Sequence, residues 1–376
     1  MPLDPYFADR LRRERRYWIR QALHRLKSRF GWPWFMRPSA EEGVRSAPPA
    51  EKGRAKEAAR KETRAAEKAG KPHPSQKRAA HRKQAKSWDR KELAKSGTPG
   101  PRVRTVERTV PVDGYPDVRV RIHYPTATWD PATDGPIPAC LTFFGGAFRI
   151  GGIDYATTDA ANRRRAADAR VAMVAVDYAL APEQRFPAPV EQGVAALRWL
   201  FEHAHEFGID PDRIAVSGTS AGGNIAAAVA LANRDRDGLP IRLQLLEVPV
   251  VDLTGRHIDF APTRELGIPT LIMARELLSV ARTYLPRRRD AKHPLASPIR
   301  AESLEGLPPA VVLTAEYDPL RGDGAAYVAA LRNAGVEATG VRYLGVTHDT
   351  GIYTGVLAAA RRWHDDVVSA LRRLHD

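Results

Sequence analysis

Several features are scarce or missing in this chain of 376 residues, and each absence excludes a class of protein. Cys140 is the only cysteine, so the sequence offers no disulfide framework of the kind that small secreted proteins use. No apolar run reaches the ~18–20 residues that a transmembrane helix requires. The N-terminus lacks the charged-then-apolar pattern of a secretory signal. We therefore expect a cytoplasmic protein in which Cys140, within an apolar strand, is a buried and inert thiol.

Large apolar side chains are missing from one long stretch. Between Pro38 and Trp88 there is no Phe, Tyr, Trp, Ile or Leu. Such a segment cannot bury enough apolar surface to offset the loss of chain entropy on folding. We predict that residues 37–101 form a basic, disordered linker, with transient helix across Glu51–Ala69.

The positive charge lies in the same half of the chain. Residues 1–100 contain 27 Lys and Arg against 11 Asp and Glu, whereas the rest of the chain contains 32 against 33. The formal net charge of +15 therefore belongs to the N-terminal region, where it favours weak contact with a polyanion. No zinc-finger or RNA-binding motif accompanies this charge, so specific nucleic-acid binding is not expected.

Residues 1–36 predict a basic amphipathic helix. Apolar side chains recur at helical spacing from Phe7 to Phe30, and arginines lie between them. Two interpretations stay open. The helix lies on an anionic membrane surface, which would make the protein peripheral to a membrane, or its apolar face packs on the globular body as part of a cap.

Residues 102–376 predict a single α/β domain. After a first hairpin around Asp113-Gly114, apolar strands alternate with helical segments. This alternation is typical of a mostly parallel sheet with helices on both faces. The expected strands cover 103–110, 118–124, 138–144, 171–178, 243–248, 310–315 and 337–344, and another leads into residue 220; the expected helices cover 159–169, 189–206, 225–232, 323–334 and 356–371.

A candidate nucleophile lies between one of these strands and the following helix. Ser220 is the central residue of Gly218-Thr219-Ser220-Ala221-Gly222, after an apolar strand and before an alanine-rich helix. A serine on such a turn is exposed above the sheet, and the Ala221 N–H at the helix start faces any oxyanion formed there. The alternative is a glycine-rich turn before a buried helix, but the flanking strand and helix favour the nucleophile.

Two partners for Ser220 follow later strands. Asp318 comes after the strand 310–315, and His348 comes after the strand 337–344. A serine hydroxyl needs a base to accept its proton, and the base needs an acid to hold its tautomer. The chain order Ser220, Asp318, His348 is the order that this strand-and-helix architecture uses for such a triad. Gly145, Gly146 and Ala147 follow an early strand and predict an oxyanion hole together with Ala221.

These motifs resemble the hormone-sensitive-lipase branch of the α/β-hydrolases, the bacterial family IV esterases. The resemblance covers roughly residues 102–376 and rests on Phe144-Gly145-Gly146-Ala147-Phe148 with Gly151 and Asp154, on Asp177-Tyr178-Ala179-Leu180-Ala181-Pro182-Glu183 with Phe186-Pro187, on Gly218-Thr219-Ser220-Ala221-Gly222-Gly223-Asn224, on Asp318-Pro319-Leu320 and on His348. It implies an α/β-hydrolase fold with about eight strands and a small helical cap. Phe148 and Tyr178, within these motifs, are predicted to contact the substrate.

The chain departs from the family pattern at several positions. Phe144 and Ala147 stand at the ends of a motif that is His-Gly-Gly-Gly in the family, Ala179 stands where the family usually has Arg, and Asp349 follows His348. Ala147 still offers its N–H, whereas Phe144 removes a polar side chain. Asp349 is placed to raise the pKa of the histidine.

The resemblance implies a serine carboxylesterase that hydrolyses short- to medium-chain esters through an acyl-enzyme, without metal or cofactor. The alternative is a catalytically weak or inactive binding protein of the same fold, similar to the plant gibberellin receptor, with the basic region as a polyanion or membrane tether. His348 argues against this alternative and Phe144 keeps it open. The predicted partner is a small-molecule ester, and a homodimer is a further alternative.

Overall fold

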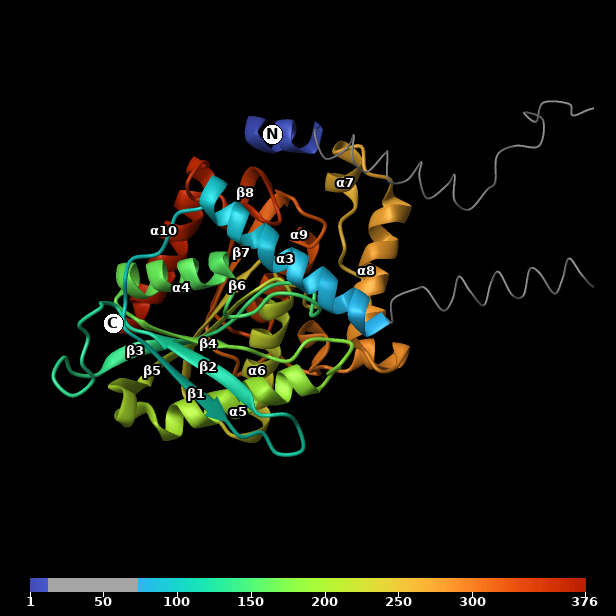
Figure 1. Cartoon of the computed structure of the whole chain (residues 1–376). Coiled ribbons are helices and arrows are strands. Elements are labelled where there is room, and N and C mark those ends of the chain that lie inside the picture. The colour runs from blue at the N-terminus through green and yellow to red at the C-terminus, as the bar shows by residue number, and fades with distance from the viewer. Residues whose placement is uncertain (13–73) are drawn as a thin grey trace, which may run out of the picture. The chain divides into compact units, whose positions relative to one another are not determined.

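Eight strands form one sheet in the computed structural model, which describes residues 1–12 and 74–376 (Figure 1). The strand order is β1-β2-β4-β3-β5-β6-β7-β8. The first two pairs, β1–β2 and β2–β4, are antiparallel and all later pairs are parallel, as the alternation of strands and helices predicts. The strands are β1 Thr105–Val110, β2 Val118–His123, β3 Ile137–Phe143, β4 Ala172–Val176, β5 Ile209–Thr219, β6 Ile241–Glu247, β7 Ala310–Tyr317 and β8 Ala338–Thr347.

Helices cover both faces of this sheet. β3 and β4 are buried at every residue, as expected for strands packed on both sides. Side chains of α5, α6 and α9 belong to one buried apolar cluster, whereas those of α4 and α10 belong to a second. The helices are α3 Pro74–Ser96, α4 Ala156–Ala169, α5 Ala188–Glu202, α6 Ala221–Arg236, α7 Ala261–Glu265, α8 Thr270–Tyr284, α9 Arg321–Asn333 and α10 Ala358–Arg372.

Cys140 lies in β3 within the second cluster. It is fully buried, and burial raises the pKa of its thiol to about 12. A thiol with this pKa forms almost no thiolate at neutral pH, so the prediction of an inert cysteine is confirmed.

The described α/β unit includes residues that come before the predicted start of the globular body at residue 102. The α/β unit comprises Met1–Phe7 and Ala85–Asp376, so it includes the second half of α3. Here Asp89, Glu92 and Ser96 are buried, and the Ser96 carbonyl accepts a 3.0 Å hydrogen bond from Gly355. The low apolar content of residues 37–101 predicted no ordered helix, because only a few side chains at the end of α3, such as Leu93, contact the body.

Only the first part of the predicted N-terminal helix is described. Residues 5–12 are helical. Phe7 is buried and meets the ring of Tyr353 edge-on, with centroids 5.3 Å apart, which agrees with the packing interpretation at this residue. Residues 13–36 and the predicted transient helix Glu51–Ala69 lie outside the described residues. In the second unit, Ala8–Gln84, the described residues 8–12 and 74–84 are helical.

None of the helices within residues 1–12 and 74–376 combines the length and the apolar character that crossing a bilayer requires.

Candidate active site

Ser220 lies at the turn between β5 and α6, in the backbone geometry that the motif predicts. Its φ of 56° and ψ of −114° are unfavourable for a residue with a Cβ. The turn closes only because its flanking residues are glycines. A Cβ on Gly218 would overlap the Gly222 carbonyl, and one on Gly222 would overlap the Phe143 carbonyl. The Ser220 N–H donates to the Glu247 carbonyl at 2.8 Å, which fixes the turn to the end of β6.

The structure brings Ser220, His348 and Asp318 together as the chain order predicts. His348 Nε2 lies 3.0 Å from Ser220 Oγ, and His348 Nδ1 lies 2.7 Å from Asp318 Oδ2. The second oxygen of Asp318 accepts the Leu320 N–H at 2.9 Å. Asp318 is 1% exposed, so water does not compete for its carboxylate. With Nδ1 protonated toward Asp318, Nε2 is free to accept the serine proton.

The charge near His348 stabilises its protonated form. Burial lowers the pKa of His348, but the charge and hydrogen bond of Asp318 outweigh burial, and Asp349 adds to them. Together they raise the pKa to about 9. The predicted influence of Asp349 is confirmed in direction. An imidazole of this pKa holds a proton firmly once it has taken one from serine.

A second turn brings N–H groups beside Ser220. A Cβ built on Gly145 would lie 3.5 Å from the Ser220 Cβ, so this loop lies against the nucleophile. Gly146 and Ala147 have φ of 140° and 54°. Among the described residues, no acceptor takes the N–H groups of Gly146, Ala147 or Ala221. Free N–H donors next to a nucleophile are the groups that stabilise an oxyanion.

Phe144 packs where the family pattern has a polar side chain. Its ring stacks on Tyr178 with centroids 4.1 Å apart, and the Tyr178 hydroxyl donates to the Phe144 carbonyl at 2.8 Å. The loop is therefore held through its backbone, and the departure at Phe144 leaves the donor groups in place.

Phe148 and Tyr178 do not contact the cavity beside Ser220, so their predicted contact with substrate is not supported. Phe148 is fully buried and stacks on Tyr284 with centroids 3.8 Å apart. Tyr178 is 2% exposed. Neither contributes to the cavity lining. Both are large aromatic residues in signature motifs, but they pack behind the loop and do not line the cavity.

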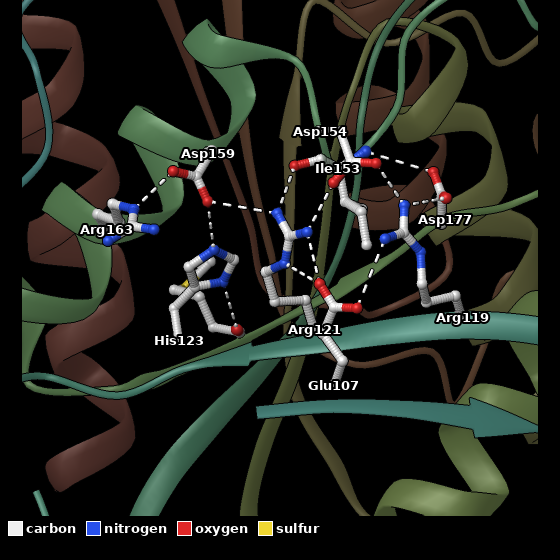
Figure 2. A network of polar contacts seen from close by, with 10 residues as sticks. Glu107, Arg119, Arg121, His123, Ile153, Asp154, Asp159, Arg163 and Asp177 are labelled. Carbon is white, nitrogen blue, oxygen red and sulfur yellow. Dashed lines mark hydrogen bonds and ion pairs between the residues drawn. The ribbon is translucent and has the colours of Figure 1, made fainter. Parts of the chain in front are cut away.

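A charged network holds the end of the same loop (Figure 2). Asp154 accepts hydrogen bonds from Arg119 and Arg121 of β2, both at 2.6 Å. Arg121 also donates to the Ile153 carbonyl at 3.0 Å, and Arg119 donates to Asp177 at 2.9 Å. Burial opposes ionisation of Asp154, but the two arginines outweigh it and lower its pKa. The loop that begins at Gly145 is thus tied to the sheet at both ends.

A cavity of about 410 Å³ opens on Ser220 and His348. The residues from Gly145 to Ala147 form part of its wall. The second half of α3 forms another part, with Trp88, Asp89 and Leu93 among its lining residues. This volume lies within the range of small-molecule sites in proteins.

Asp89 joins α3 to the start of α4. Its carboxylate accepts the Thr157 N–H at 3.2 Å and also the Thr157 hydroxyl. The residue before α4, Tyr155, makes no side-chain capping bond. Asp89 therefore supplies the cap from another helix, and its negative charge suits the positive end of the α4 dipole.

Comparison with known proteins agrees with this architecture. A family model described as the alpha/beta hydrolase fold matches residues 140–351, more than half of the chain. The chain belongs to the α/β-hydrolase family. The resemblance to its hormone-sensitive-lipase branch is confirmed by these matches and by the relatives that follow.

Several esterases are similar to this hydrolase. Carboxylesterase NlhH of Mycobacterium tuberculosis is 37% identical over 279 residues, which cover 73% of this chain and 83% of that protein. An arylesterase of Saccharolobus solfataricus is 34% identical over 68% of this chain and 80% of that protein. The crystal structure of EstE1, a thermostable carboxylesterase from a metagenomic library, has a TM-score of 0.72 and 35% identity over 80% of this chain and 98% of that one.

Sequence reasoning missed the walls of the cavity of this hydrolase. Trp88 and Asp89 lie within the predicted linker, and Asn162 lies in a helix that was expected only to cover the sheet. The return of large apolar residues at Trp88 and Leu93, after a long stretch without Phe, Tyr, Trp, Ile or Leu, was the available signal for α3. No pattern in the sequence marked Asn162.

Proposed function

We propose that this hydrolase is a serine carboxylesterase. The observation that supports the proposal most directly is the continuous set of contacts Ser220–His348–Asp318, at 3.0 and 2.7 Å, beside free backbone N–H groups at the mouth of a cavity. The names of its relatives, carboxylesterase and arylesterase among them, point to the same reaction class.

In the proposed mechanism, Ser220 Oγ attacks the ester carbonyl carbon while His348 Nε2 takes the serine proton. The carbonyl oxygen gains negative charge and accepts hydrogen bonds from Gly146, Ala147 and Ala221. Collapse of this intermediate breaks the bond to the alcohol oxygen, which receives the proton from His348. Asp318 holds the Nδ1 proton and stabilises the imidazolium that forms between these steps.

Water completes the cycle. His348 accepts a proton from water, and the resulting hydroxide attacks the acyl-enzyme carbonyl. The carboxylic acid leaves and Ser220 regains its proton. The cavity volume of about 410 Å³ supports esters of short to medium chain length. The cycle consumes one ester and one water, and no step requires a redox partner.

The test is hydrolysis of p-nitrophenyl butyrate by the wild type and by Ser220→Ala. We expect the substitution to reduce the hydrolysis rate to a residual level. That level is about 10³–10⁴-fold above the uncatalysed reaction in water and comes from substrate binding and the oxyanion hole. Ser303→Ala, at an exposed serine outside the cavity, is the matched control and should retain full activity. A folded wild type that hydrolyses no ester of any acyl length would overturn the proposal and favour the small-molecule binding protein.

We also propose two finer points. The first is a cytoplasmic location. The second, suggested by the net positive charge of residues 1–100, is weak, salt-sensitive contact with an anionic membrane surface or another polyanion; a homodimer stays a prediction. Co-sedimentation of the full chain with anionic vesicles at low and high salt tests the contact. Equal recovery with neutral vesicles would contradict it.

A further inference from the structure

A second buried carboxyl group lies close to the catalytic acid and has no part in the mechanism above. Asp323 is in the first turn of α9, shortly after Asp318 in the chain, and its side chain is fully buried. Its Oδ1 accepts the N–H groups of Val251 and Asp252, at 3.2 and 2.9 Å. Asp323 therefore joins the start of α9 to the segment that follows β6.

This segment, residues 251–260, also packs on the turn that carries Asp318. The Asp259 N–H donates to the Pro319 carbonyl at 2.9 Å. The Asp259 carboxylate pairs with Arg321 at 2.7 Å. The position of the catalytic acid thus depends on how firmly the segment is held to the start of α9.

The charges of the neighbouring carboxylates are balanced, whereas that of Asp323 is not. Asp252 accepts a 3.0 Å hydrogen bond from the Arg300 guanidinium, and Asp318 is paired with His348. Asp323 forms no ion pair in the part of the chain that the structure describes, and its buried Oδ2 has no hydrogen-bond partner there. An isolated carboxylate is costly to bury, so such a group takes up a proton instead.

The groups that face Asp323 also disfavour its charge. Burial raises the pKa of Asp323 most strongly, the N–H groups of Val251 and Asp252 lower it, and the negative charges of Asp252 and Asp318 raise it further, to about 7. His257, the histidine of the same segment, lies 3.6 Å from Asp252 Oδ2 and does not pair with Asp323. An ordinary aspartate would already be ionised well below neutral pH.

We propose that Asp323 is a positioning residue that acts as an uncharged carboxylic acid up to neutral pH and holds the segment after β6 against the turn of Asp318. The positioning role rests on the carboxylesterase function above, whereas the proton on Asp323 can be tested without any activity. The uncharged acid still accepts both N–H groups through its carbonyl oxygen. It also places no second negative charge beside Asp318, which keeps the charge of the catalytic acid for His348.

Infrared difference spectroscopy of the full chain tests the proton directly. At about pH 6 the ordinary aspartic and glutamic acids are ionised, so only a carboxyl group of raised pKa shows the carbonyl stretch of a neutral acid. We expect this band in the wild type at about pH 6, its loss by about pH 9, and no such band in Asp323→Asn. Asp365→Asn, at an exposed carboxylate of α10, is the matched control and should keep the band.

Thermal unfolding measures the effect of the proton on stability. The asparagine in Asp323→Asn accepts the same N–H groups but cannot ionise. Because the pKa of Asp323 is higher in the folded state than in the unfolded chain, its proton stabilises the fold at low pH and this contribution is lost as the pH rises. Relative to Asp323→Asn, the wild type should therefore lose Tm between about pH 4 and pH 7 and change little above that range.

Steady-state hydrolysis of p-nitrophenyl butyrate measures the positioning role. Asp323→Asn should retain kcat within about threefold of the wild type, because it keeps both hydrogen bonds. Asp323→Ala removes the acceptor and should lower kcat by about tenfold to 10²-fold, the scale of a displaced catalytic group. Should the alanine variant fail to fold, the infrared and unfolding measurements on Asp323→Asn still decide the proposal.

Several results would overturn the proposal. A folded wild type without the neutral-acid band at about pH 6, or a band that persists in Asp323→Asn, would show that Asp323 carries no proton. A Tm difference that does not vary with pH would reduce Asp323 to an ordinary structural carboxylate. A folded Asp323→Ala with the kcat of the wild type would remove the positioning role. A folded wild type that hydrolyses no ester would remove that role together with the carboxylesterase function, and the infrared band distinguishes this failure from the absence of the proton.

Discussion

The two sides of the candidate active site are built in different ways. The triad side consists of residues at strand ends, where Ser220, His348 and Asp318 are paired with one another at 2.7–3.0 Å. The cavity side includes residues of α3 and α4, where Asp89 of α3 accepts the Thr157 N–H of α4 at 3.2 Å and Asn162 lines the cavity. The comparison indicates that the triad is positioned by the ends of sheet strands, whereas the cavity wall is positioned by contacts between helices, such as Asp89–Thr157.

The largest expected effect comes from breaking the triad side. Asp318→Asn keeps the shape of the acid but favours the wrong tautomer of His348, so kcat should fall about 10⁴-fold. Steady-state hydrolysis of p-nitrophenyl butyrate measures this loss. Asp365→Asn, at an exposed position of α10, should change nothing. An Asp318→Asn enzyme with kcat within tenfold of the wild type would show that Asp318 does not orient the histidine.

A smaller loss is expected from displacing the oxyanion loop. The added methyl in Gly146→Ala would overlap the Ile150 carbonyl, so the loop must shift and kcat should fall by about 10²–10³-fold. Gly114→Ala is the control. Gly114 also has a positive φ, of 72°, but a Cβ there would have no atom within 4 Å, so this variant bears the backbone strain without the collision. Equal activity of both variants would contradict the proposed role of Gly146.

The cavity side should respond mainly in substrate binding. Asp89→Ala removes the cap that α3 supplies to α4, which should cost about 1 kcal/mol of stability. Because α3 is a wall of the cavity, we expect KM to rise about three- to tenfold while kcat changes little. Thermal unfolding and steady-state kinetics measure the two effects. The control Asp113→Asn, in the exposed turn after β1, should alter neither the stability nor KM. If Asp89→Ala lowered kcat and left KM unchanged, Asp89 would act on the triad and not on the cavity wall.

The smallest expected effect is a shift of the pH profile. Proton transfer from serine needs neutral His348, so kcat/KM should rise with pH through a pKa near 9, above the ordinary histidine value. Asp349 raises this pKa, and Asp349→Asn should therefore move the rising limb to lower pH by less than about one unit. Asp376→Asn, at the exposed C-terminal residue, should leave the profile in place. A shift to higher pH would reverse the assigned sign.

Much of the fold and of the triad could be predicted because these features are local or periodic. Strands buried on both faces read as short apolar runs, and the Gly218–Gly222 turn has few alternatives, since each glycine passes a carbonyl that a Cβ would meet. The aromatic residues were harder to place. Phe148 and Tyr178 stand in signature motifs, but the direction in which each ring points depends on its partners Tyr284 and Phe144.

The sequence by itself determined the parallel sheet, the strand-end positions of Ser220, Asp318 and His348, and the pairing chemistry that these residue types require. Only the tertiary structure decided that α3 closes the cavity, that Asp89 caps α4, and that Asn162 faces the cavity while Asp159 faces the sheet. The physical reason is the range of the interactions. A strand end or a glycine turn is fixed by its neighbours in the chain, whereas a cavity wall is fixed by contacts such as Asp89–Thr157, which join residues 68 positions apart.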